Sequence, residues 1–252
     1  MKFITYFDYL GFGEFIRNND QPYQNRVLGN IFRDMESALA RGKLKEAPHG
    51  VIADFSETRV HCINFSDTVI YWTNDTTVES LKELMDVTHR FTWQTNLYFF
   101  PARGSIVIGE MERIDYSSTS EVGGTYNLNS VFGKGLVRAH EIAEKQYWAG
   151  TILDSGVFDF IMKNVENPED YLKKYTKSYN VPLKDDKFVE MNAFHLTDGA
   201  GINDEAFKNL SNGIRENWAN HNKSVVHPSV KAKLDNTLEF LESYKNGKPN
   251  DK

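Results

Sequence analysis

Two short segments, residues 2–15 and 63–73, constrain the fold of this chain more than any other feature. Each is largely apolar and carries a conspicuous aspartate, Asp8 in the first and Asp67 in the second. Residues 3–7 are predicted to form a buried strand just before Asp8, whereas Asp67 lies in a two-residue connection typical of a β-hairpin tip. Charged side chains are rarely buried in an apolar core, so packing alone does not explain either aspartate.

The remaining pattern mixes helices and strands, which predicts an α+β fold with a largely antiparallel sheet, helices on one face and the other face open. Strands are predicted at residues 51–55, 58–65, 68–73, 103–111, 151–153 and 188–196. Helices are predicted at residues 16–39, 78–99, 133–148, 155–164 and 230–244, the last docking on the domain or on a partner. Loops or turns are predicted at residues 41–50, 116–129, 168–187 and 198–201, and a frayed end at 246–252.

Composition excludes several classes of protein. The net charge of −6 argues against a nucleic-acid surface, although a local basic pocket can still hold a triphosphate. No apolar run is long enough to span a membrane and no signal pattern is present, so we expect a soluble cytoplasmic protein. Cys62 is the sole cysteine, which excludes an intramolecular disulfide and a cysteine-based zinc site. The HExxH zinc motif that begins at His140 fails, because Glu144 replaces the second histidine.

Asp8 and Asp67 suit a metal site if their strands are neighbours in the sheet. Two adjacent carboxylates repel each other unless a cation lies between them, which favours one or two Mg²⁺ or Mn²⁺ ions. Such ions complete their coordination with substrate phosphates and water, so the pair indicates phosphoryl or nucleotidyl chemistry. Ordinary turn chemistry explains either aspartate taken alone.

Four segments carry a family resemblance, in the order FDYLGF, INFSDTVIYW, ARGSIVIGE and VFGKGLVRAHEIAE. They resemble sequence blocks of class III nucleotidyl cyclases, most closely the bacterial pyrimidine cyclases of the Pycsar antiphage systems. The resemblance covers residues 1–153, and the chain after residue 168 matches only loosely the extension of those proteins. It implies a ferredoxin-like class III cyclase fold at residues 1–165, followed by a C-terminal extension at residues 166–252.

The resemblance also implies roles for individual residues. It places two Mn²⁺ or Mg²⁺ ions on Asp8, Asp67 and the backbone carbonyl of Tyr9. The turn would wrap the substrate phosphates, although a structural turn explains its sequence equally well. The turn residues are Gly11, Phe12 and Gly13.

The positions that read purines in better-known cyclases are altered here. On our alignment, Val137 and Glu141 replace the asparagine and arginine that hold the ribose and stabilise the transition state. Ile63 replaces the base-reading lysine, and the second base-reading position falls near Asn129 or Ser130. Either the chain is an inactive regulator or it reads another base, and the two retained aspartates favour the second reading.

Some cation must replace the lost arginine if the chain is active. Arg103, at the start of its strand, and Lys134, in a glycine turn before a helix, are best placed to meet phosphate charge. Arg103 could equally be a surface residue of its strand, and Lys134 could equally be a solvated turn residue. Arg138 is a weaker candidate.

The implied reaction converts UTP to 3′,5′-cyclic UMP and pyrophosphate, with CTP as the alternative substrate. Related cyclases build the site at a head-to-tail dimer interface, so we expect a homodimer, and a separate cyclic-nucleotide-responsive effector that acts in antiphage defence. We expect neither nucleic-acid nor membrane partners. A non-catalytic nucleotide-binding module and a structural ferredoxin-like interaction domain remain alternatives.

Overall fold

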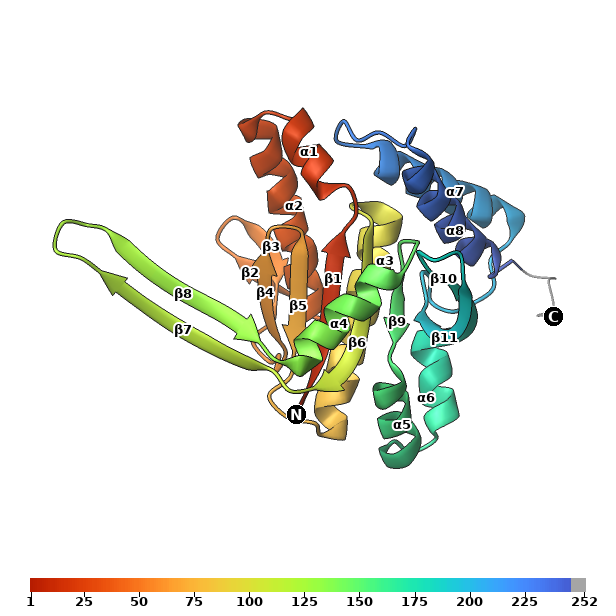
Figure 1. Ribbon diagram of the computed structural model, residues 1–252, viewed down its shortest axis with the longest axis horizontal. Coiled ribbons are helices and arrows are strands. Elements are labelled where there is room, and N and C mark those ends of the chain that lie inside the picture. The colour runs from red at the N-terminus through yellow and green to blue at the C-terminus, as the bar shows by residue number, and fades with distance from the viewer. Residues whose placement is uncertain (246–252) are drawn as a thin grey trace.

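The computed structural model describes residues 1–245. They form a large mixed sheet, helices that pack on it, and two separate hairpins (Figure 1). The strands of the large sheet are β1 (Lys2–Tyr9), β4 (His61–Phe65), β5 (Thr68–Trp72), β6 (Ala102–Gly109), β9 (Thr151–Leu153), β10 (Thr176–Pro182) and β11 (Phe188–Phe194). The hairpins are β2 (Leu44–Ala47) with β3 (Gly50–Ala53), and β7 (Glu112–Thr119) with β8 (Thr125–Phe132). The helices are α1 (Phe12–Asn18), α2 (Gln21–Leu39), α3 (Val78–Tyr98), α4 (Lys134–Lys145), α5 (Ser155–Asn164), α6 (Pro168–Tyr175), α7 (Asp204–Ala219) and α8 (Pro228–Glu242).

Within residues 1–245, the large sheet has seven strands in the order β10-β11-β9-β6-β1-β5-β4. Its strand pairs are antiparallel except for β6 with β9. The predicted α+β class with a largely antiparallel sheet is therefore confirmed, and the arrangement is compatible with a ferredoxin-like fold. Strand β1 lies inside the sheet, between β5 and β6, so it fixes the position of the residues that follow its C-terminal end.

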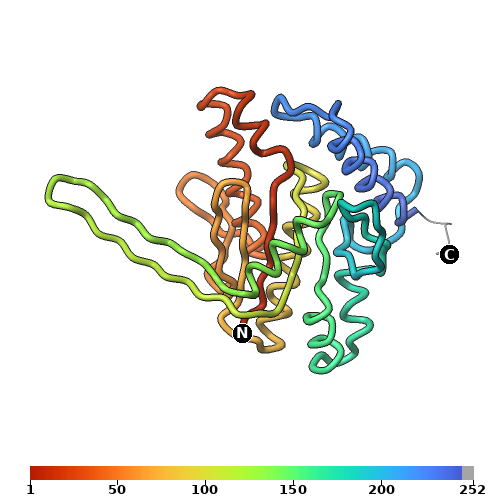
Figure 2. The backbone as a smooth tube through the Cα atoms, viewed as in Figure 1, coloured from red at the N-terminus to blue at the C-terminus, as the bar shows by residue number. Residues whose placement is uncertain are grey.

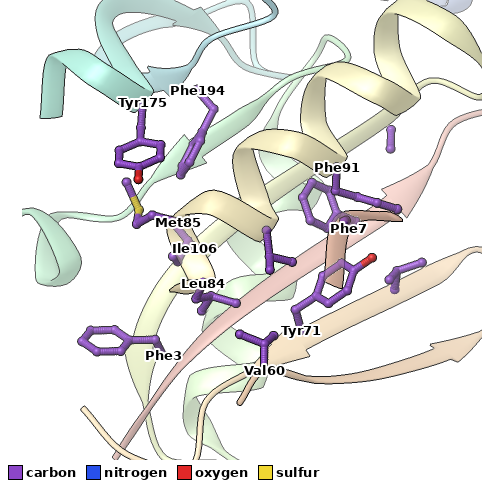
Figure 3. Close-up of a cluster of buried hydrophobic side chains, with 14 of the residues drawn as sticks. Phe3, Phe7, Val60, Tyr71, Leu84, Met85, Phe91, Ile106, Tyr175 and Phe194 are labelled. Carbon is purple, nitrogen blue, oxygen red and sulfur yellow. The ribbon is translucent and has the colours of Figure 1, made fainter. Parts of the chain in front are cut away.

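The alternation of side chains along β1 divides them between two faces of the sheet. On one face, Phe3 and Phe7 enter the main core together with Phe91 of α3 (Figure 3). On the other face, Ile4 and Tyr6 pack with residues of α4. Helix α4 thus covers part of the face that the sequence pattern left open, and Asp8 follows Ile4 and Tyr6 onto this same face.

The C-terminal extension continues the sheet of the preceding domain. Strand β11 pairs with β9, Ala193 opposite Ile152, and β10 forms the edge. Tyr175 and Phe194 of the extension lie in the main core with Phe3 (Figure 3). Helix α8 buries its leucines against the body of the protein, as its apolar spacing predicts.

The prediction of a loop at residues 116–129 is wrong. These residues belong to the β7–β8 hairpin, which extends away from the body as an arm, on the side opposite the extension (Figure 2). Both faces of the arm are largely exposed, so its sequence lacks the apolar alternation that marks a half-buried strand.

Two further predictions of irregular structure are also wrong. The loop predicted at 41–50 contains β2, one half of a small exposed hairpin. The turns predicted after residue 168 are α6 and β10. Helix α6 has Pro168 at its first position, acidic residues in its first turn and lysines in its last turn, which are favourable helix-end signals. The frayed end predicted at 246–252 lies outside the described residues.

Candidate functional site

Asp8 and Asp67 lie at the same end of two neighbouring strands. Asp8 is opposite Thr68 in the β1–β5 pairing, and the backbone N–H of Tyr9 donates a hydrogen bond to the Asp67 carbonyl oxygen at 2.9 Å. Ser66 has a φ of 56°, the left-handed value that a two-residue hairpin favours at its first position. The hairpin thereby places the half-buried Asp67 beside the C-terminal end of β1.

Arg103 is the direct partner of Asp8. The two residues face each other across β1 and β6, and Arg103 donates to Asp8 Oδ2 from Nε at 2.9 Å and from Nη2 at 2.8 Å. Arg103 Nη2 also pairs with Glu144 Oε1. The Arg103 side chain is only 7% exposed and that of Asp8 16%. Arg103 is therefore a buried cation shared by two carboxylates, not a free cation directed at solvent.

Glu144 and Lys184 extend this cluster, and the sequence pattern did not identify either of them. Glu144 lies in the last turn of α4, and its Oε2 accepts a hydrogen bond from Lys184 Nζ at 2.8 Å. A cavity of about 700 Å³ adjoins the pair, and His140 and Lys187 also line it. Glu144 is distant in sequence from Arg103, and Lys184 lies in a lysine-rich segment without a motif, so no local signal connects them.

The charges around Asp8 do not balance completely. Burial raises the pKa of the Asp8 carboxyl above its usual range, the Arg103 charge opposes this rise, and the Asp67 charge adds to it. The two aspartates are thus close enough to repel each other. His140, which hydrogen-bonds through Nδ1 with Tyr6 Oη at 3.1 Å, lies near enough to lower the pKa of Asp8 slightly.

The oxygen atoms at this end of the sheet fit a hard divalent ion in their chemistry. Arg103 binds Oδ2 of Asp8 and leaves Oδ1 outside that ion pair. Asp8, Asp67 and the Tyr9 carbonyl are the residues that would hold Mg²⁺ or Mn²⁺ there. Residues 1–245 contain no group of three or more His, Cys, Asp or Glu side chains placed to bind a metal, so substrate and water would have to complete the coordination.

The glycine turn follows β1 directly. Gly11 has a φ of 81° and precedes α1, and the Lys223 side chain passes so close that a Cβ on residue 11 would lie 3.1 Å from Lys223 Cδ. Gly11 therefore satisfies both a left-handed backbone and a close approach. Phe12 is buried and its ring stacks with Tyr9 at 6.4 Å between centroids, so the Phe12 side chain is a core residue. Gly13 lies within α1.

Two predicted substrate-binding residues lie elsewhere in the chain. Asn129 is on the β7–β8 arm, opposite Asp115. Lys134 begins α4, with a side chain that is 91% exposed, at the far end of the sheet from Asp8. This placement follows from the packing of Gly135 on Gly109, because Gly109 pairs with the first residue of β1. A single chain does not bring these two residues to Asp8.

Two of the positions that depart from the purine-reading pattern lie on the solvent side of α4, whereas the third, Ile63, lies on β4 and packs against the core. Val137 is 56% exposed and Glu141 is also exposed. Arg138 donates from Nη2 to Asp154 Oδ1 at 2.7 Å, and this pairing engages the third candidate cation.

Comparisons with protein-family models and curated proteins give no match for this chain. Among the described residues, no helix has the length and apolar character needed to cross a membrane.

Proposed function

We propose that this protein is a pyrimidine nucleotide cyclase that converts UTP to 3′,5′-cyclic UMP and pyrophosphate, with CTP as the alternative substrate. The observation that carries the proposal is the meeting of Asp8 and Asp67 at one end of the paired strands β1 and β5. Burial is the main cause of the raised pKa of Asp8, and the neighbouring Asp67 charge adds to it; a divalent cation between the two carboxylates would relieve that repulsion. The sequence resemblance to class III cyclases supports the choice of reaction.

The proposed reaction is attack of the ribose 3′-hydroxyl on the α-phosphate, with pyrophosphate as the leaving group. Divalent ions on Asp8, Asp67 and the Tyr9 carbonyl would activate the hydroxyl and neutralise the leaving group. Arg103 has a different role from the free cation expected from the sequence. Its two hydrogen bonds fix Asp8 Oδ2, so we assign it as a positioning residue that orients the carboxylate.

The β7–β8 arm supports a dimeric form of the enzyme. A two-stranded hairpin is only marginally stable alone in water, yet this one exposes apolar side chains along its length. These residues are Ile114, Tyr116, Val122, Tyr126 and Phe132. In a head-to-tail homodimer the arm would lie on the partner and carry Asn129 toward the partner's site. We expect a dimer in size-exclusion chromatography with light scattering, and a monomer when residues 115–129 are replaced by a tight turn.

A non-catalytic nucleotide-binding module is the second candidate. The ion pair with Arg103 favours it, because this pair neutralises much of the Asp8 charge without any metal. In that case the cluster would hold the sheet and α4 together, and a nucleotide would bind without reaction.

One experiment separates the candidates. The purified protein is incubated with each of the four nucleoside triphosphates and Mn²⁺, and pyrophosphate and cyclic product are measured. The cyclase proposal predicts both products with UTP or CTP. Tight triphosphate binding without pyrophosphate release supports the non-catalytic module. If the protein neither binds a triphosphate nor releases pyrophosphate, both candidates are overturned. Action of the product on a separate effector in antiphage defence is a further proposal, which rests on the family resemblance alone.

A further inference from the structure

The loop between α7 and α8 is fixed onto the segment that follows β1. Asn19 Nδ2 donates to the His221 carbonyl oxygen at 2.7 Å, and the Ser224 backbone N–H donates to Glu14 Oε1 at 3.0 Å. These bonds connect residues about two hundred positions apart in the chain, and they hold Lys223 beside Gly11.

Lys223 is a buried cation without a hydrogen-bonding partner. The residue is only 8% exposed, and its Nζ has no hydrogen-bond partner among the described residues. Nζ lies 3.8 Å from the centroid of the Phe100 ring, which is a weak substitute for an anion. Burial lowers the pKa of Lys223 to about 7, against the smaller opposing influence of Glu14. An unpaired buried ammonium opposes folding, so stability does not explain why it is there.

Two more lysines of the extension lie around the Asp8 end of the sheet. Lys184 contacts Glu144, the second partner of Arg103. Lys233 Nζ, on α8, lies 5.5 Å from the centroid of the Tyr147 ring, and Tyr147 directly follows Gln146, whose carbonyl oxygen Arg103 binds. Burial lowers the pKa of Lys233, and the charges of Arg103 and Lys184 lower it further. In a chain with a net charge of −6, the extension thus gathers cations at one place.

We propose that the C-terminal extension supplies, within the same chain, the lysines that bind the polyphosphate group of the substrate, with Lys223 beside Gly11 as the principal ligand and Lys184 and Lys233 flanking Asp8. The choice of a nucleoside triphosphate as the ligand rests on the proposed function. A phosphate oxygen near Gly11 would give the Lys223 ammonium the charged acceptor that it lacks. The extension would then be a necessary part of the site.

The test measures binding of inorganic tripolyphosphate and of UTP by calorimetry in the presence of Mg²⁺. It compares the full-length wild-type protein, Lys223→Met, Lys233→Met and Lys231→Met, the last a control at an exposed lysine of α8. We expect Lys223→Met to lower the affinity for both ligands by roughly 10- to 100-fold, the range for loss of one charged hydrogen bond. Lys233→Met should weaken them less, and Lys231→Met should bind as the wild type does.

Thermal unfolding of the same variants separates a binding role from a structural one. A binding role predicts an unchanged or higher Tm for Lys223→Met, because the substitution removes an unpaired buried charge. Equal affinity in Lys223→Met and wild type, a lower Tm for Lys223→Met, or no tripolyphosphate binding by the wild type would each overturn the proposal.

The same experiment distinguishes this inference from the proposed function. A wild-type protein that binds tripolyphosphate through Lys223 yet forms no cyclic product supports the anion site and contradicts the cyclase. A protein that forms cyclic product with the same KM in wild type and Lys223→Met supports the cyclase and overturns the role of Lys223.

Discussion

Arg103 and Lys223 are both buried cations, but their surroundings are opposite. Arg103 binds the carboxylates of Asp8 and Glu144 and two backbone carbonyl oxygens. Among residues 1–245, Lys223 Nζ has no hydrogen-bonding partner and lies over the face of the Phe100 ring. A buried charge with its partners in place is part of the folded structure, whereas a buried charge without them raises the free energy of the protein until a ligand arrives. Arg103 therefore holds the site together, whereas Lys223 has a charge without a hydrogen-bonding partner among residues 1–245, and this charge is the one we propose binds the ligand.

Replacement of Arg103 should have the largest effect on stability. Arg103→Met leaves the Asp8 carboxylate largely buried and unpaired, and we expect a loss of about 3–5 kcal/mol in the free energy of unfolding. Urea denaturation measures this loss. Lys187→Met, which removes an exposed pair with Asp185, is the matched control and should leave the free energy of unfolding close to that of the wild type. Equal small changes in both variants would show that the Arg103 pair is dispensable.

Replacement of Lys223 should change stability in the other direction. The pKa of Lys223 in the folded state is about 7, below its ordinary value, so the charged form of Lys223 opposes folding. This destabilisation is fully present below about pH 7. It decreases as the pH rises from there toward the pKa of the unfolded state. Lys223→Met should be more stable than the wild type by about 1–4 kcal/mol at pH 6, and the difference should shrink by pH 10.

Neighbouring charges do not reverse this expectation. Glu14 faces Lys223 from α1, and its effect is already included in the lowered pKa. His221, in the same loop, has a pKa lowered to about 4, so it stays neutral over the whole range. Urea denaturation at several pH values tests the prediction, and a Lys223→Met variant less stable than the wild type at pH 6 contradicts it.

The contact between Gly11 and Lys223 should give the smallest effect. Gly11→Ala places a side chain at a φ of 81°, which costs about 1–2 kcal/mol, and it also crowds Lys223. In a Lys223→Ala background the crowding disappears while the backbone strain remains. A double-mutant cycle should therefore show a smaller loss from Gly11→Ala in that background. Equal losses in both backgrounds would mean that the two residues are not coupled.

The sequence predicts most strands of the large sheet, the main helices and the hairpin of Asp67, because the spacing of apolar residues in these elements reflects their burial. The arm cannot be predicted in this way, because neither of its faces is covered. Residues such as Tyr116 and Ser117 therefore show no alternation of apolar and polar side chains. Helix α6 and strand β10 could not be predicted in this way because they are rich in lysines and tyrosines, which also occur in turns.

The candidate site divides in the same way. Asp8 and Asp67 can be predicted because each is a charge within an apolar run. The partners of Arg103 cannot, since they depend on which residue of α4 and which turn of the extension meet the start of β6. Lys223 is an ordinary loop lysine in the sequence, and only the tertiary structure reveals that it is buried.

The most direct test of the account is pyrophosphate release from UTP with Mn²⁺ by the wild-type protein, Asp67→Ala and Asp8→Asn. Asp67→Ala leaves the Arg103 cluster intact, and Asp8→Asn keeps a hydrogen-bond acceptor for Arg103, so both variants should remain folded. We predict that the wild type releases pyrophosphate together with cyclic UMP, and that both variants fall to background. Wild-type rates in folded Asp67→Ala would contradict the assignment of the two aspartates as the catalytic pair.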